Sequence, residues 1–315
     1  MAKEATRESY GKALKEFGAD KNIVVMDADL SKSTKTEMFQ KEYPKRFINC
    51  GIAEANMMCV AAGLASCGKT VFASSFAMFA SGRAFEQIRN SICYPNLNVK
   101  IGSTHAGISV GEDGATHQAL EDIAIMRALP NMTIINPSDA IEARLAVKAA
   151  IDNYGPFYLR FGRLAVDVIN DNPSYKFEIG KGVTLKDGND VTIIATGLMV
   201  AHAIEAVKEL NDEGINARLI NIHTIKPIDK DIIIKAAKET GAIVTCEEHS
   251  IIGGLGSAVA EVLCENSPCI LERVGTKDVF GRSGKPNELF KVYGLTPKDI
   301  KEAAKRAIAK KTIII

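Results

Sequence analysis

The apolar positions of the chain follow two alternating patterns. Short β-branched runs predict strands, and longer stretches with apolar residues every three to four positions predict helices. In the first half, strands are expected at 22–26, 46–49, 70–73, 99–102, 133–135 and 157–161, and helices at 1–18, 54–66, 84–93, 118–128 and 139–152. Strands separated by helices are typical of a parallel sheet covered on both faces.

The pattern stops at Asn170-Asp171-Asn172-Pro173, a turn-rich stretch without an apolar period, and then starts again. Beyond it, strands are expected at 191–195, 217–220, 242–246 and 269–271, and helices at 199–211, 229–240, 254–264 and 297–309. We therefore place a boundary near residue 175, between a domain of residues 1–172 and a domain of residues 178–315. The sequence predicts an α/β protein built from two three-layer α/β/α domains.

Composition argues against several classes of protein but does not indicate the chemistry of this one. The 39 Lys and Arg nearly balance the 38 Asp and Glu, so a net charge of +1 offers no long-range field for nucleic acid or an anionic membrane. No segment has the roughly 18 uninterrupted apolar residues of a membrane span. The seven cysteines include no Cys-x-x-Cys pair, which favours reduced thiols over disulfides or zinc. We expect a cytoplasmic protein that holds no metal itself.

Glu54 is the only charged residue between Arg46 and Lys69. It follows Gly51-Ile52-Ala53 at the end of an expected strand and opens a helix of small and apolar residues. As a structural residue it would stabilise the helix dipole. As a functional residue it would lie where open α/β sheets bind ligands, and a carboxylate in apolar surroundings can act as a tuned acid or base. The pattern alone leaves both interpretations open.

Two further segments carry candidate chemistry. Phe76 and Phe79 lie three residues apart among small residues, either as core packing or as a platform for a planar ring.

Residues 103–118 form a glycine-rich loop of sixteen residues with no apolar period, and the loop contains Glu112 and two of the five histidines. Long loops dense in titratable groups are usually functional. We therefore take His105, Asp113 and His117 as candidate site residues.

Three common motifs are missing. The sequence has no G-x-x-x-x-G-K-[ST] phosphate loop, no G-x-S-x-G nucleophile elbow and no G-x-G-x-x-G turn after a strand. The glycines at 253, 254 and 256 open an expected helix, where a tight turn is favoured over an anion site.

The chain resembles the thiamine diphosphate enzymes of the transketolase group. The resemblance is carried by Gly51-Ile52-Ala53-Glu54, by Phe76 and Phe79, by Thr104-His105, and by Gly111-Glu112-Asp113-Gly114-Ala115-Thr116-His117-Gln118. It spans the family's pyrimidine-binding domain from about residue 6 to 163, and more loosely its C-terminal domain to about residue 309. The Gly-Asp-Gly motif with which the family binds the diphosphate and Mg²⁺ occurs nowhere in the sequence. The resemblance therefore implies the C-terminal subunit of a split transketolase.

The resemblance also implies a role for each candidate residue. Glu54 would hydrogen-bond N1′ of the cofactor's aminopyrimidine and favour its activation. Phe79 would stack on that ring with Phe76 beside it, and Asp29 would lie near the cofactor. His105, Asp113 and His117 would bind substrate oxygens, with the two histidines moving protons. A clamp for the substrate phosphate would be formed by Arg7, Ser33 and Arg160.

The resemblance also implies partner subunits, and other families remain as alternatives. An N-terminal subunit with the Gly-Asp-Gly…Asn motif would hold the diphosphate and Mg²⁺, and self-association through the pyrimidine domain would give an α2β2 assembly that acts on sugar phosphates.

A deoxyxylulose-5-phosphate synthase fragment is the nearest rival, but that family has Asp-Arg-Ala-Gly where this chain has Thr104-His105-Ala106-Gly107. The β subunit of a 2-oxoacid dehydrogenase lacks the His-Asp-His loop. A scaffolding subunit without activity is the non-enzyme alternative. His249 is conspicuous in the second domain, where a structural role is favoured.

Overall fold

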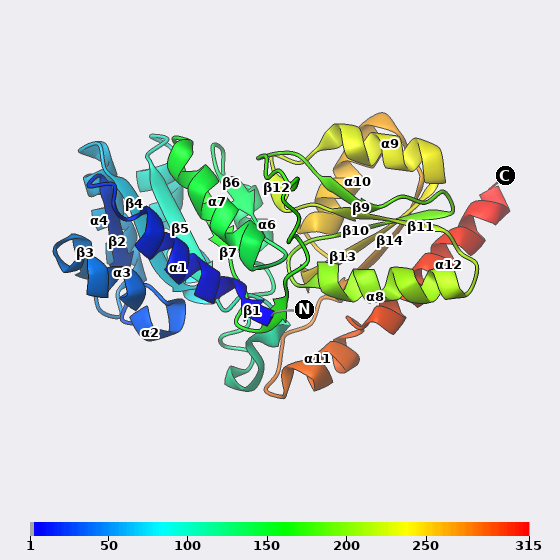
Figure 1. Cartoon of the computed structure of the whole chain (residues 1–315), viewed down its shortest axis with the longest axis horizontal. Helices are drawn as coiled ribbons and strands as arrows, with labels where there is room; N and C mark the ends of the chain where they lie inside the picture. The colour runs from blue at the N-terminus through cyan, green and yellow to red at the C-terminus, as the bar shows by residue number, and fades with distance from the viewer. Residues whose placement is uncertain (1–2, 315) are drawn as a thin grey trace.

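Two β-sheets, each enclosed between layers of helices, organise the chain (Figure 1). The structure is a computed structural model that describes residues 3–314, with side chains described up to Lys311. The α/β class predicted from the sequence is confirmed. A short antiparallel ribbon of β1 (Lys3–Ala5) and β8 (Ala165–Asp167) lies at the N-terminal end of the described chain.

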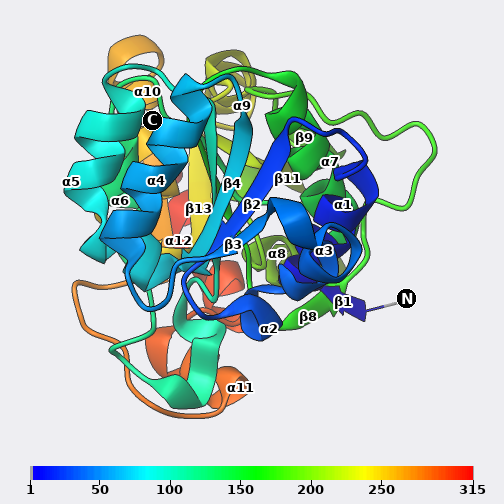
Figure 2. The same cartoon turned by 90° about the vertical axis from the view of Figure 1, so that its left-hand side faces the viewer.

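The first sheet has seven strands in the order β12-β6-β7-β5-β4-β2-β3. Six are parallel: β2 (Ile23–Asp27), β3 (Phe47–Asn49), β4 (Thr70–Phe76), β5 (Val99–Thr104), β6 (Thr133–Ile135) and β7 (Phe157–Arg160). One face is covered by α1 (Thr6–Phe17), α2 (Ser31–Thr34), α3 (Glu37–Glu42) and α7 (Ala140–Asp152), and the other by α4 (Glu54–Ser66), α5 (Phe85–Gln87) and α6 (Asp122–Arg127) (Figure 2).

The second sheet has five strands in the order β14-β13-β10-β11-β9. They are β9 (Val183–Lys186), which is antiparallel at the edge, β10 (Val191–Ala195), β11 (Ala217–Asn221), β13 (Ala242–Ser250) and β14 (Ile270–Thr276). Its faces are covered by α8 (Met199–Asp212) and α12 (Pro297–Ile314) on one side and α9 (Lys230–Thr240) and α10 (Leu255–Asn266) on the other. A further helix, α11 (Pro286–Tyr293), packs against the 3₁₀ turn Ile108–Asp113 of the first half.

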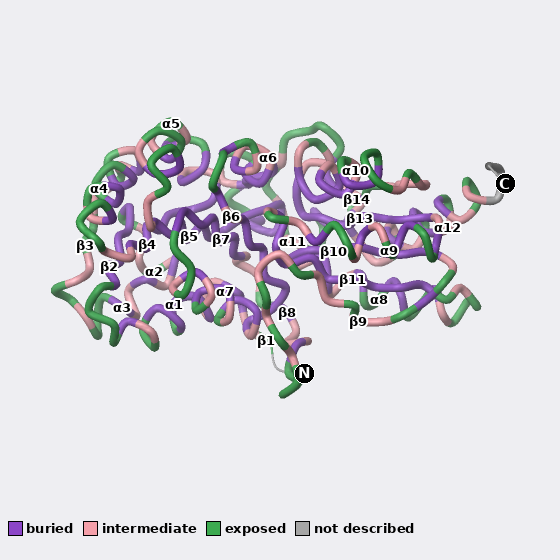
Figure 3. Tube along the Cα trace, turned by 90° about the horizontal axis from the view of Figure 1, so that it is seen from above, coloured by how far each residue is buried: buried purple, intermediate pink, exposed green. Residues whose placement is uncertain are grey.

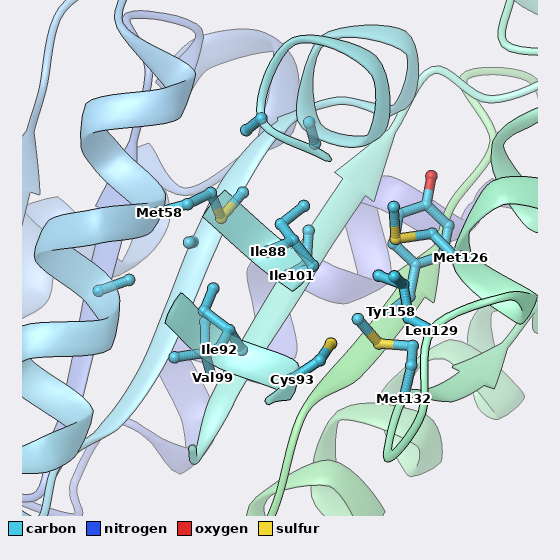
Figure 4. Close-up of a cluster of buried hydrophobic side chains, with 14 of the residues drawn as sticks. Met58, Ile88, Ile92, Cys93, Val99, Ile101, Met126, Leu129, Met132 and Tyr158 are labelled. Atoms are coloured by element: carbon cyan, nitrogen blue, oxygen red, sulfur yellow. The ribbon is translucent and has the colours of Figure 1, made fainter. Parts of the chain in front are cut away.

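The central strands are buried along their whole length, whereas the outer sides of the helices are exposed (Figure 3). Strands buried on both faces are apolar runs without alternation, which is why the sequence pattern found them. In the first core, Met58 of α4 and the Ile88 and Ile92 side chains pack over Val99 and Ile101 of β5 (Figure 4). Each such apolar side chain contributes on the order of 1.5–3 kcal/mol by leaving water.

Two features differ from the expected elements. The single helix expected at 84–93 is an α-helical turn between two π-helical segments, Phe79–Arg83 and Ile88–Cys93. π-Helical turns are rare in proteins and frequent at functional sites. The strand β12 (Thr224–Lys226), from the second half of the chain, joins the first sheet antiparallel to β6. The two halves therefore share a sheet as well as an interface.

Candidate active site

The candidate residues gather at one edge of the first sheet. Asp29 follows β2, Glu54 opens α4 after β3, Phe76 ends β4, and His105 follows β5. Because these strands are parallel, their carboxyl ends meet at the same edge, which is where open α/β sheets bind ligands. Segments far apart in sequence thus contribute to one site.

Glu54 is a buried carboxylate beside an aromatic ring. Its side chain is 4% exposed, and it accepts hydrogen bonds from Ser75 Oγ at 3.4 Å and from Arg83 Nη1 at 3.2 Å. The Arg83 guanidinium also lies over the Phe79 ring, with 4.0 Å between its central carbon and the ring centroid. Sequence reasoning did not single out Arg83, although it is the only charge between Lys69 and Glu86.

Four rings form a continuous aromatic group behind this carboxylate. Phe76 stacks on His105 with 3.8 Å between the ring centroids, and it lies nearly parallel to Phe79 at 5.9 Å. His117 meets the Phe79 ring edge-on at 5.1 Å. Phe76 is buried, whereas Phe79 and His117 are partly exposed. Phe79 therefore offers the accessible face on which a planar ligand ring can stack.

His105 is held neutral. Its Nε2 lies 3.0 Å from Arg7 Nη1, and because a guanidinium group can only donate, Nε2 is the acceptor. The ring proton therefore lies on Nδ1, which donates to Thr104 Oγ1 at 2.9 Å. Burial, together with the charges of Arg7 and Arg163, lowers the pKa of His105 to about 3. Its backbone has a φ of 56°, in the left-handed region that non-glycine residues rarely adopt.

A positive patch lies next to His105. Arg7 Nη1 also donates to the backbone oxygen of Ser33 at 2.9 Å, so two of the predicted clamp residues are in contact. Burial lowers the pKa of Arg7; Glu8 opposes this shift, and the charge of Arg163 adds to it. Arg163 is partly exposed and donates to Val110 O and, at 3.4 Å, to Glu112 Oε2.

The structure places Arg160, which was predicted to form part of the phosphate clamp, in a buried ion pair. Its side chain is only 3% exposed, and its donors are used by the buried Asp122 carboxylate, with a distance of 2.8 Å from Nε to Oδ2. Burial opposes the charge of Arg160, but Asp122 raises its pKa. In this structure the guanidinium group faces Asp122 and the backbone of β13. Arg163, three residues further along the chain, is the arginine that lies beside Arg7.

The remaining predicted residues are on the rim. Asp113 is exposed on the turn between Gly111 and Gly114, which both have positive φ angles of 84° and 77°. Asp29 is exposed and exchanges hydrogen bonds with Asn49, at 3.1 Å through its backbone N–H and 3.2 Å through its carboxylate. The neighbouring residue Asp27 is buried and has a structural role. Its carboxylate accepts hydrogen bonds from the Leu30 amide and from the hydroxyl groups of Thr34 and Thr36.

Comparison with known proteins identifies the family. The model of the transketolase pyrimidine-binding domain matches residues 2–168, and that of the transketolase C-terminal domain matches residues 180–300. The chain belongs to the transketolase family. A relative from Methanocaldococcus jannaschii, named a putative transketolase C-terminal section, is 54% identical over 93% of both chains. A 6-deoxy-6-sulfo-D-fructose transketolase subunit from Clostridium sp. is 44% identical over 97% of this chain and 95% of its own length.

A solved structure of a transketolase family member has the same fold. Named a split gene transketolase in an inactive β4 tetramer, it has a TM-score of 0.91 and 55% sequence identity, and the match covers 98% of this chain and 99% of that one. This chain therefore corresponds to the C-terminal section of a split transketolase. Among the described residues, no helix is both long and apolar enough to span a membrane.

The residues at this edge fit the aminopyrimidine part of thiamine diphosphate. Such a ring needs a buried acceptor for a ring nitrogen and an aromatic face to stack on. Glu54 supplies the acceptor, and Phe79 supplies the aromatic face. Within the described part of the chain, no group of three or more His, Cys, Asp or Glu side chains is placed to hold a metal ion.

Proposed function

We propose that this chain supplies cofactor activation and substrate recognition to a transketolase that moves a two-carbon ketol unit from a ketose phosphate to an aldose phosphate. The observation that carries the proposal is the buried Glu54 carboxylate, linked through Arg83 to the Phe79 ring, at the same sheet edge as the loop of His105 and His117. Thiamine diphosphate, when bound, supplies the electron sink that allows the carbon–carbon bond beside a ketose carbonyl to break.

Glu54 would hold a proton at N1′ of the aminopyrimidine, and its low exposure strengthens that hydrogen bond because little water competes for it. Phe79 would stack on the ring. Arg83 now contacts both Glu54 and Phe79, so the cofactor ring would take over contacts that Arg83 makes. Arg83 is 52% exposed and has room to move aside.

The substrate would lie between the aromatic group and the positive patch. His105 stays neutral, and its Nε2 would accept from a sugar hydroxyl in place of Arg7, while Asp113 and His117 on the rim would contact other hydroxyl groups. Arg7 and Arg163, with the loop of Ser33, would bind the substrate phosphate, since guanidinium groups suit paired contacts with phosphate oxygens. In this proposal Arg163 takes the place expected for Arg160.

A second chain would complete the site. The sequence has no Gly-Asp-Gly motif, and the solved relative that consists of four β chains is named inactive. We therefore propose an N-terminal subunit whose Gly-Asp-Gly…Asn motif holds the diphosphate through Mg²⁺. We also propose self-association through the pyrimidine domain, to give an α2β2 assembly.

The role of Glu54 is tested by Glu54→Gln in the complex reconstituted with that subunit, thiamine diphosphate and Mg²⁺. The measurement is exchange of the cofactor's C2 proton with solvent deuterium, followed by NMR. We expect the exchange rate to fall by about 100-fold or more, because an amide cannot act as the carboxylate does at N1′.

The control is Glu86→Gln, which removes an exposed carboxylate from α5 and should leave the rate unchanged. Both variants should keep the wild-type circular dichroism spectrum. A Glu54→Gln complex that exchanges the proton at the wild-type rate would remove Glu54 from the activating role.

A further inference from the structure

The end of β13 connects the second domain to the active-site loop. It carries three consecutive buried titratable residues, Glu247, Glu248 and His249, with exposures of 1%, 4% and 0%. Successive side chains of a strand point to opposite faces, so the two carboxylates face different surroundings. Glu247 accepts from the amides of Leu255 and Gly256 at the start of α10, within its own domain.

Glu248 faces the other way, into the first domain. Its Oε1 accepts a hydrogen bond from the Ser109 amide, 2.5 Å away, in the 3₁₀ turn that continues the loop of His105. Gly107 lies flat against the same carboxyl group: a Cβ on Gly107 would come within 2.4 Å of Glu248 Cδ. No side chain of the loop therefore comes between Glu248 and the Gly107–Ser109 backbone.

The loop between His105 and Ser109 is fixed at successive points. The Ala106 amide donates to Phe161 O at 3.3 Å, and the Gly107 amide donates to Ala119 O at 3.0 Å. The Glu248 carboxylate then holds the Ser109 amide, and it is the one of these three anchors that comes from the second domain. Because His105 has a left-handed backbone, its position depends on what holds the residues after it.

The surroundings of Glu248 are built to accommodate a buried carboxylate. Burial raises the pKa of Glu248 to about 6, while the charge of Arg160 and the Ser109 hydrogen bond lower it. Arg160 Nη2 donates to the Glu248 backbone oxygen at 3.0 Å and also to Asp122 at 3.2 Å. Arg160, displaced from its expected role at the phosphate, thus links β7 and the start of α6 to β13.

We propose that Glu248 is a positioning residue of the active site: its carboxylate holds the 107–109 backbone and thereby sets the orientation of His105 and of the turn that carries Asp113. This gives the second domain a role in the reaction. The kinetic consequence rests on the proposed function, whereas the effect on the loop does not.

The first test is hydrogen–deuterium exchange of the chain by itself, comparing Glu248→Ala, Glu248→Gln and the matched control Glu247→Ala. We expect Glu248→Ala to speed exchange at 106–111 about tenfold or more, because the Ser109 amide loses its charge-assisted hydrogen bond. Glu248→Gln keeps an oxygen acceptor and should restore most of the protection. Glu247→Ala should speed exchange at 254–257 and leave the loop protected.

Unchanged protection of the loop in Glu248→Ala, or equal loosening in Glu247→Ala, would overturn the proposal. If Glu248→Ala fails to fold, Glu248→Asp provides the same test, because a side chain shorter by one methylene withdraws the carboxylate from the Ser109 amide while keeping its charge. Glu248→Asp should then loosen 106–111, and wild-type protection in this variant would contradict the positioning role.

The second test is kinetic and uses the reconstituted complex. Glu248→Ala should raise KM for the ketose phosphate about tenfold, with rescue by Glu248→Gln, whereas Glu247→Ala should change thermal stability without changing KM. A KM equal to that of wild type, or a Gln variant as impaired as the Ala variant, would contradict the proposal. If wild type itself transfers no ketol unit, the proposed function fails, and the exchange experiment still decides the role of Glu248.

Discussion

Arg160 and Arg163 lie three residues apart, and their guanidinium groups have different surroundings. Arg160 is enclosed with Asp122, Tyr158 and the backbone of β13, and Tyr158 Oη donates to the same Asp122 oxygen at 2.8 Å. Arg163 is partly exposed beside Arg7. The first residue stabilises the interface between the domains, and the second is available to a ligand.

The two arginines should therefore give opposite results when each is replaced by alanine. Arg160→Ala leaves Asp122 as a buried, unpaired charge and should lower the free energy of unfolding by about 3–5 kcal/mol, measured by denaturant titration. Arg163→Ala should change this free energy by less than about 1 kcal/mol, since its ion pair is partly exposed. In the reconstituted complex, Arg163→Ala should raise KM about tenfold for a phosphorylated ketose and much less for the free sugar.

Equal effects of Arg163→Ala on phosphorylated and free sugars would remove it from the proposed clamp. A fully stable Arg160→Ala variant would contradict the buried ion pair.

Individual site residues could be predicted from the sequence where a titratable residue stands apart from its surroundings. Glu54 stood out as a lone charge, and His105 and His117 stood out in a loop without a period; the structure brings all three near Phe76 and Phe79. Arg83, Arg163 and Glu248 were missed because their neighbours come from other segments. Only folding shows that Glu248 meets Ser109, which lies 139 residues away in the chain.

Helix α4 has an exposed side that carries no charge. Asn56, Cys59, Val60 and Gly63 recur at helical spacing and are all exposed, and Val60 is 38% exposed. Nearby, Ile48 and Ile52 are exposed at 37% and 77%. Apolar residues grouped in this way mark interaction surfaces. They support the proposal that a second copy of the pyrimidine domain packs here, next to Glu54.

Val60→Glu should weaken this self-association, because the interface would have to bury an unpaired carboxylate. We expect a dissociation constant at least about tenfold higher and a lower mass by light scattering. The matched control is Ile204→Glu on α8 of the second domain, a site with a similar exposure of 37%. That variant should keep the wild-type mass. A Val60→Glu protein with the wild-type mass at every concentration would place the interface elsewhere.

The pattern of apolar residues predicted the long elements of both sheets because buried parallel strands and amphipathic helices have clear periods. It missed the short ones. The three residues of β12 are too few to show a period, and their pairing with β6 is a contact between the two halves. The helix expected at 84–93 has the right residues, but its π-helical turns depend on packing that the local sequence does not reveal.

The whole molecule combines three contributions to one site. The first sheet places Glu54, Phe79 and His105 near one edge, and the second domain contacts the loop of residues 103–118 through Glu248 and α11. We propose that α4 adds a surface for a second copy. The proposed partner adds the grip on the diphosphate and Mg²⁺. In this account catalysis belongs to the assembly of both chains.

The most direct test of this account is ketol transfer by separately purified chains. The purified chain, the N-terminal subunit and their mixture are each supplied with thiamine diphosphate, Mg²⁺, xylulose 5-phosphate and ribose 5-phosphate, and formation of sedoheptulose 7-phosphate is followed. We expect product only in the mixture. Full activity from this chain alone, or a mixture that forms deoxyxylulose phosphate from pyruvate but transfers no ketol unit, would contradict it.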